Sequence, residues 1–198
     1  MMRASVPGAA APVNRMLALP RSSADLLNKL EAVRLVCRET GCAQRYLAGD
    51  ALTAIHHGTQ RIDAECGTDY HARLADYVTR VHADDLTLGI AMTDARGDRS
   101  LRPSRQPVAD TYVHVIERHA DGIVISGTKA IVTSAPYVHE LLVMPCRAMK
   151  EADRDFAVCC AVPIDAPGLT IVARPAGRPG EAAAKFSGKY GQSTAVCL

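Results

Sequence analysis

The chain has 198 residues, of which 48% are hydrophobic, and its 23 basic and 21 acidic residues give a formal net charge of +2. This length and hydrophobic content suit one domain or two small ones with a buried core, and they exclude a disordered segment. Such balanced charge argues against nucleic acid as a partner, and no apolar run approaches the roughly 20 residues that span a bilayer, so a membrane protein is not expected.

The first third of the chain is predicted to be helical behind an N-terminal tail. Residues 1–24 contain arginines, small residues and prolines but only neutral or basic side chains, a composition that transit peptides share and that we interpret as a mobile tail. Ser23 is a plausible helix cap and Gly41 a plausible end, and an apolar stripe of Leu26, Leu27, Leu30, Val33 and Cys37 lies between them. Two further amphipathic patterns, at residues 45–58 and 70–81, complete a helical front domain over residues 25–85.

From residue 86 onward the pattern changes to short β-branched runs, at residues 86–92, 111–118, 122–133, 139–146, 156–164 and 168–175. Helices followed by consecutive strands predict an α+β fold with an antiparallel β domain over residues 86–198, and argue against a Rossmann cofactor site. The sequence HADG at 119–122 predicts a hairpin turn, because Asp-Gly accepts positive φ angles. The final run, Ala195 to Leu198, is typical of a strand just entered, so we expect the chain to stop within this domain.

The cysteines and histidines do not form a metal-binding pattern. Cys37 and Cys42 are five positions apart, Cys159 and Cys160 point to opposite faces of a strand, and His56 and His57 are adjacent on a helix. A zinc site built by this chain alone is therefore not expected. The seven cysteines are also odd in number and irregularly spaced, which favours the reducing cytoplasm over a secreted disulfide framework.

Polar residues gather at the ends of two predicted strands. In AMTDARGDRS, residues 91–100, Thr93 ends a strand, and arginines follow at positions 96, 99, 102 and 105. These arginines suit either a solvated loop or a clamp for a pyrophosphate, which guanidinium groups bind through paired hydrogen bonds. In VTSAP, residues 132–136, Thr133 and Ser134 end a second strand. The pair of strand ends suggests a heteroaromatic cofactor laid across the β domain, with ordinary turn chemistry as the alternative.

Several separated motifs resemble one flavoprotein family, which contains 4-hydroxybutyryl-CoA dehydratase and 4-hydroxyphenylacetate 3-hydroxylase. They are CAQRYLAGDAL, HGTQ, AMTDARGDRS, YVHVIERHADGIVISGTKAIVTSAPYVHELLVMPCRAM and EADRDFAVCCAVPIDAPGL, and the resemblance covers residues 26–198. It implies an acyl-CoA-dehydrogenase-like fold with a helical front domain, a middle β domain and a C-terminal helical bundle that drives tetramerisation. We expect this chain to lack the bundle.

The resemblance also implies a cofactor site. The residues expected to hold FAD are Met92, Thr93, Asp94, Arg96, Arg99, Ser100, Thr133 and Ser134. The dehydratase branch, which the motifs resemble more closely, acts on an acyl-CoA and adds a [4Fe–4S] cluster held by three cysteines and one histidine. Here Cys42 occupies the first ligand position and Tyr46 the second, so Cys42 is a remnant ligand and a cluster is not expected.

Tyr46 instead matches a substrate-side tyrosine of the hydroxylase branch, whose members use FAD and oxygen on a phenol, and it is the catalytic candidate. That branch carries an arginine where Cys42 stands and a histidine where Ile90 stands, so the substrate, acyl-CoA or phenol, stays open. Two functions follow. The first is the FAD-binding part of a homo-oligomeric oxidoreductase, incomplete as a catalyst, and the alternative is a catalytically silent relative that binds a partner chain through exposed apolar surface.

Overall fold

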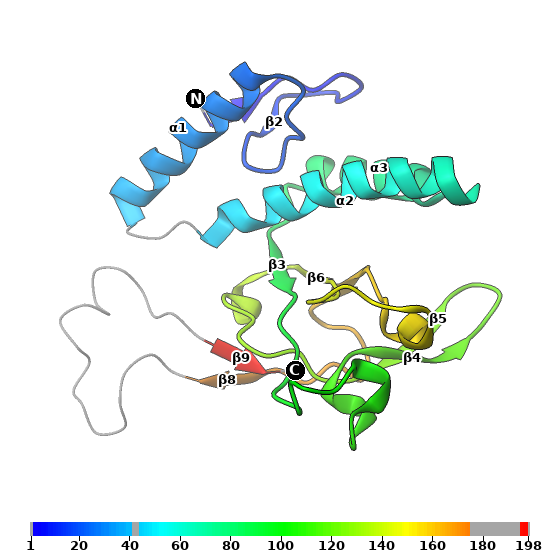
Figure 1. Cartoon of the computed structure of the whole chain (residues 1–198). Coiled ribbons are helices and arrows are strands. Elements are labelled where there is room, and N and C mark those ends of the chain that lie inside the picture. The colour runs from blue at the N-terminus through cyan, green and yellow to red at the C-terminus, as the bar shows by residue number, and fades with distance from the viewer. Residues whose placement is uncertain (1, 41–43, 175–194, 198) are drawn as a thin grey trace, which may run out of the picture. The chain divides into compact units, whose positions relative to one another are not determined.

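The computed structural model describes residues 2–40, 44–174 and 195–197, and it divides into two compact units, Met1–Thr87 and Leu88–Leu198 (Figure 1). Helices make up most of the first unit, and the regular structure of the second unit consists of small sheets and short 3-10 helices, so the predicted α+β class is confirmed. The boundary between the units lies close to the predicted one at residue 85. In the described part of the chain, no helix is both long enough and apolar enough to cross a membrane.

The described residues of the first unit form three helices, α1 (Ser23–Thr40), α2 (Gln44–Cys66) and α3 (Tyr70–Ala83). Helices α2 and α3 lie side by side (Figure 1). Their facing apolar residues, Leu52, Leu74, Val78 and Val81, are buried and form the core. The predicted periodicity therefore places the beginnings of both helices correctly, although α2 continues to Cys66, beyond the predicted stretch at 45–58.

The N-terminal segment differs from the predicted mobile tail. Strands β1 (Arg3–Ala4) and β2 (Val13–Asn14) form an antiparallel hairpin, and Val13, Met16 and Leu17 are buried. Hydrogen bonds fasten the segment to the end of α3: Asn14 Nδ2 donates to Asp85 Oδ1 at 3.1 Å, and a ring nitrogen of His82 lies 3.2 Å from the Leu17 carbonyl oxygen. The tail prediction is wrong because composition alone does not show that three apolar side chains of this segment become buried when the chain folds.

Helix α1 lies at the predicted place in the sequence but buries a different face from the predicted one. Its cap is Ser22 rather than Ser23, because the Asp25 N–H donates to Ser22 Oγ at 3.2 Å while Asp25 Oδ2 accepts from the Ser22 hydroxyl. The predicted core stripe faces solvent, with Leu26, Leu27 and Leu30 exposed by 50%, 64% and 47%. The helix instead buries the neighbouring face with Lys29 and Ala32, where Lys29 Nζ donates to the Ala18 carbonyl at 3.4 Å. The orientation of α1 was thus set by the N-terminal segment and not by its own apolar stripe.

The second unit is built on a three-stranded sheet of β3 (Leu88–Ala91), β6 (Glu140–Val143) and β7 (Cys160–Pro163), in the order β3-β6-β7. Strands β6 and β7 pair antiparallel, as predicted for this domain, whereas β3 and β6 pair parallel, which makes the sheet mixed. A parallel pair needs a long crossover, and residues 92–139 supply it. The remaining strands pair antiparallel, β4 (His114–Arg118) with β5 (Ile123–Ser126) and β8 (Val172–Arg174) with β9 (Ala195–Cys197).

The β4–β5 hairpin turns at residues 119–122 as predicted, although its glycine is used differently. His119 N donates to Gly122 O at 2.8 Å, yet Gly122 does not have a positive φ angle. The positive angle is found at Gly127, where φ is +134°. A Cβ atom on Gly127 would lie 2.4 Å from the Tyr112 carbonyl oxygen and 2.5 Å from Val113 Cα. Only glycine fits there, just beyond the end of β5 and two residues before Lys129.

Candidate functional site

The structure pairs the predicted strand end at Thr93 with residues 128–130, just before the second predicted strand end at Thr133. The backbone beyond β3 runs beside residues 128–130, because Ala130 N donates to the Thr93 carbonyl at 2.8 Å and Ala95 N donates to the Thr128 carbonyl at 3.3 Å. Met144, just beyond β6, donates from its N–H to the Ala91 carbonyl at 3.1 Å. We call residues 91–95, 128–134 and 144 the strand-end junction.

A buried ion pair holds the strand-end junction. Lys129 Nζ forms an ion pair with Asp94 Oδ1, and the two side chains are only 3% and 6% exposed. The same ammonium donates to the carbonyl oxygens of Met92, at 3.0 Å, and Met144, at 2.9 Å. Lys129 therefore ties three chain segments together. The other carboxylate oxygen of Asp94, Oδ2, is buried and has no hydrogen-bond partner among the described residues.

Thr133 lies in a strained turn. Ile131 and Ser134 have φ angles of 60° and 70°, in a left-handed region that residues other than glycine seldom adopt, and Ile131 is β-branched. Thr133 N donates to the Ile131 carbonyl at 3.1 Å, and Ile131 itself is 66% exposed. Val132, fully buried between them, anchors the turn. Strain of this kind persists where the surrounding structure enforces it, commonly at ligand-binding sites.

The loop after Asp94 presents two of its arginines to solvent. Arg96 and Arg99 are exposed, and in the part of the chain that the structure describes neither makes a hydrogen bond or ion pair. Ser100 is less free than predicted, since its hydroxyl donates to Asp98 Oδ1 at 2.6 Å. The side chain of Gln106 fixes the same turn, because Asp98 N donates to Gln106 Oε1 at 3.0 Å. The loop is thus held by its own polar residues while these two guanidinium groups remain available.

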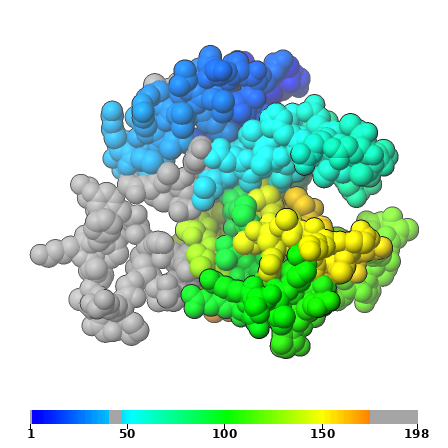
Figure 2. Space-filling model, viewed as in Figure 1, coloured from blue at the N-terminus to red at the C-terminus, as the bar shows by residue number. Residues whose placement is uncertain are grey.

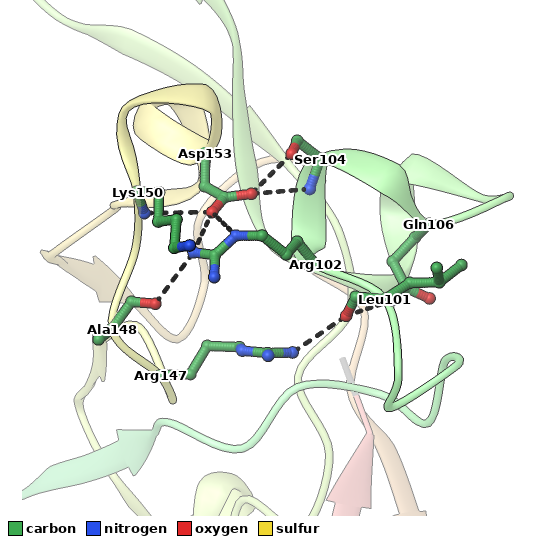
Figure 3. Close-up of polar contacts among 8 residues, drawn as sticks. All are labelled: Leu101, Arg102, Ser104, Gln106, Arg147, Ala148, Lys150 and Asp153. Atoms are coloured by element: carbon green, nitrogen blue, oxygen red, sulfur yellow. Dashed lines mark hydrogen bonds and ion pairs between the residues drawn. The ribbon is translucent and has the colours of Figure 1, made fainter.

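Arg102 does not belong to that group. It forms an ion pair with Asp153, which is fully buried, and its Nε donates to Asp153 Oδ2 at 2.6 Å. Ser104 donates to Asp153 Oδ1 twice, from its hydroxyl at 2.6 Å and from its N–H at 3.2 Å (Figure 3). The Ser104 hydroxyl is the main cause that holds the pKa of Asp153 well below its usual range, with Arg102 and the Lys150 N–H adding to it against the opposing effect of burial.

This contact fastens the arginine loop to the segment before β7. In Figure 2 the green surface of residues near 100 meets the yellow surface of residues near 150. Arg147 adds to the contact by donating to the Leu101 carbonyl at 3.2 Å. The four evenly spaced arginines therefore do not form one anion clamp: Arg102 positions the loop, whereas Arg96, Arg99 and Arg105 are exposed to solvent.

Sequence reasoning missed Lys129 and Asp153. A signal existed for Lys129, which is the single charged residue within the apolar run at 122–133. Asp153 sits in an acidic and basic stretch with no pattern that marks it as buried. Two predicted residues cannot be placed: Cys42 and the side chain of Tyr46 lie outside the described residues. Among the side chains that are described, no group of three or more potential ligands could hold a metal ion.

With this geometry known, comparison with other proteins identifies the family. The model of the family described as 4-hydroxyphenylacetate 3-hydroxylase N terminal matches residues 1–198. The chain belongs to this family. The resemblance inferred from the motifs is therefore confirmed.

Individual members of the family favour the dehydratase branch. The 4-hydroxybutyryl-CoA dehydratase/vinylacetyl-CoA-Delta-isomerase of Clostridium aminobutyricum is 40% identical over 161 residues, which are 81% of this chain and 33% of that protein. A structure of an oxygen-tolerant archaeal 4-hydroxybutyryl-CoA dehydratase from N. maritimus matches with a TM-score of 0.90 and 33% identity, over 100% of this chain and 41% of that one.

The hydroxylase branch shares the fold at lower identity. The oxygenase component of 4-hydroxyphenylacetate 3-monooxygenase, in complex with FAD, matches with a TM-score of 0.75 and 19% identity, over 98% of this chain and 40% of that one. This likeness concerns the fold alone. The chain thus corresponds to the N-terminal region of dehydratase-like and hydroxylase-like flavoproteins, and it spans about a third of the curated dehydratase and about two fifths of the solved ones.

Proposed function

We propose that the second unit of this chain binds FAD, as the N-terminal and middle part of an oxidoreductase of the 4-hydroxybutyryl-CoA dehydratase branch. The observation that carries the proposal is the strand-end junction, where the segment of Thr93 pairs with residues 128–130, directly before the strained turn at Thr133. Beside this pairing lies a buried carboxylate oxygen of Asp94 that has no hydrogen-bond partner among the described residues. The 40% identity to a dehydratase supports this branch and an acyl-CoA substrate over a phenol.

The described residues fit the chemistry of FAD. The exposed guanidinium groups of Arg96 and Arg99 suit a pyrophosphate, and Thr93 and Thr133 carry hydroxyls that can donate to the polar rim of a flavin ring. Asp94 Oδ2 can accept from an N–H or O–H group. When bound, FAD would supply electron-transfer chemistry, and the residues of this chain would hold and orient it.

Titration of FAD with the purified chain tests the proposal. We expect weak binding, detected as quenching of flavin fluorescence, because polar contacts gain little while the cofactor stays partly in water. Thr133→Val removes a hydroxyl at nearly constant volume and should raise Kd about 2- to 10-fold. Thr170→Val, at an exposed threonine of the same unit, is the matched control and should leave Kd unchanged.

Absence of quenching at millimolar FAD, with a folded circular dichroism spectrum, would overturn the proposal. It would leave the alternative of a silent module that binds a partner chain.

We further propose that this chain by itself assembles no [4Fe–4S] cluster and turns over neither acyl-CoA nor phenol. Of the expected ligand positions Cys42 is present, whereas the second holds Tyr46, whose phenol is not a thiolate. Anaerobic reconstitution with iron and sulfide should leave no stable cluster absorption, also after Tyr46→Cys. Stoichiometric iron with a cluster-type spectrum would contradict this.

Location and assembly are proposed on the same basis. A reducing cytoplasm suits the five described cysteines, all of which are free thiols. We expect a homo-oligomer, which size-exclusion chromatography with light scattering would detect.

A further inference from the structure

The Lys129–Asp94 pair is more elaborate than a structural contact requires. A buried ion pair seldom stabilises a fold more than apolar residues of the same size would, because both charges lose their hydration. Here all three N–H donors of the ammonium are used, on Asp94, Met92 and Met144. The cation is therefore fully satisfied within the chain, and it joins its own segment to the other two segments of the strand-end junction, residues 91–95 and Met144.

The anion of the pair is not satisfied. Asp94 Oδ1 faces Lys129, but Oδ2 is buried and has no hydrogen-bond partner among the described residues. Buried polar atoms in folded proteins nearly always have a partner, so an orphaned carboxylate oxygen needs an explanation. Asp94 lies one residue after Thr93, on the segment that pairs with residues 128–130. The carboxylate oxygen that lacks a hydrogen-bond donor thus lies in the proposed flavin site.

We propose that Asp94 Oδ2 accepts a hydrogen bond from the bound flavin, and that Lys129 is the positioning residue that orients it. The donor is either the imide N–H of the flavin ring or a ribityl hydroxyl. Lys129 acts in two ways: its charge compensates that of Asp94, and its bonds to the Met92 and Met144 carbonyls fix the backbone on either side. The inference rests on the proposed function.

Asp94→Asn tests Oδ2 as the hydrogen-bond acceptor while the chain keeps its fold. The Lys129 ammonium can only donate, so it selects the amide oxygen and turns the amide NH2 to the place of Oδ2. A donor then faces the donor of the flavin. We expect Kd for FAD to rise about 10- to 100-fold, the usual effect of losing a hydrogen bond to a charged group. Asp110→Asn, at an exposed aspartate of the same unit, should leave Kd within about twofold.

A flavin analogue separates the two donors. FAD methylated at the ring imide nitrogen lacks that N–H group. If the imide is the donor, the unaltered chain binds the analogue about 10- to 100-fold more weakly than FAD, and Asp94→Asn causes little further loss. If a ribityl hydroxyl is the donor, the unaltered chain binds both compounds alike, and Asp94→Asn weakens both.

A double-mutant cycle tests whether Lys129 acts through Asp94. Lys129→Met should weaken FAD binding at least about tenfold, and adding Asp94→Asn to it should cost no more, because the acceptor is already misplaced. Additive losses would show that Lys129 supports the fold alone and would overturn its positioning role. Urea unfolding of each variant verifies that the chain is folded.

Two outcomes distinguish this inference from the proposed function. If the unaltered chain binds FAD and Asp94→Asn binds it equally well, the acceptor role is wrong while the flavin site stands. If the unaltered, folded chain does not bind FAD, both are wrong.

Discussion

Gly127→Ala is expected to destabilise the second unit by at least about 2 kcal/mol. A side chain at the observed φ of +134° is strained, which costs about 1–3 kcal/mol. The new Cβ would also lie 2.4 Å from the Tyr112 carbonyl oxygen, and forcing a methyl group into packed surroundings typically costs about another 1–3 kcal/mol. The atoms in contact are backbone, which cannot move aside as a flexible side chain can. A loss of this size is a large part of the about 5–15 kcal/mol by which domains are stable.

Urea unfolding of the whole chain, followed by circular dichroism, measures this loss as a lower midpoint. Gly122→Ala is the matched control in the same hairpin, because its φ is not positive and no atom lies within 4 Å of the new Cβ. Its stability should change by no more than about 0.5 kcal/mol. Equal midpoints for the two variants would refute the reasoning, since the two glycines would then be equally replaceable.

Two further predictions concern charged groups. Burial, and then the neighbouring His71, lowers the pKa of His56 from its ordinary value of 6.5, so the folded state disfavours its protonation. The folded state therefore has its full stability above this pH and loses stability as the pH falls below it. His56→Gln should weaken the dependence of the urea midpoint on pH between about pH 7.5 and pH 5.5. An unchanged pH dependence would contradict this. Arg102→Met should lower the urea midpoint far more than the control Arg99→Met, since Arg99 is exposed. The loss of Arg102 leaves the buried Asp153 carboxylate without its cation. Equal effects of the two substitutions would show that the ion pair is dispensable.

The sequence predicted the helices well because the signals for a helix are local. Apolar spacing and a serine near the start predicted α1 within a residue of its observed beginning at Ser23, and the observed end at Thr40 precedes the predicted stop at Gly41. The same local signals did not fix which face of α1 is buried. Leu26 and Leu30 face solvent, whereas the buried Lys29, about 100° around the helix from Leu30, reaches the Ala18 carbonyl of a segment predicted to be a mobile tail.

The strands were also found, but their pairing was not. Alternation and turn residues locate β3 and β6 approximately, and nothing in either run states that the two are parallel neighbours. The predicted strand at 122–133 ends early, at Ser126, because Gly127 turns the backbone before Lys129. Local propensity cannot predict this stop, which depends on the backbone of Tyr112 and Val113 lying against the glycine.

The sequence by itself determined the family, the α+β class, the positions where the three helices begin and the two polar segments around Thr93 and Thr133, all of which depend on residues near one another in the chain. Only the tertiary structure decided where the strands end and how these polar segments are held. The Lys129–Asp94 pair joins residues 35 positions apart, and the Arg102–Asp153 pair joins residues 51 positions apart. A charged residue is ordinarily an exposed one, so its burial becomes favourable only when folding delivers an opposite charge and hydrogen-bond partners from a distant segment.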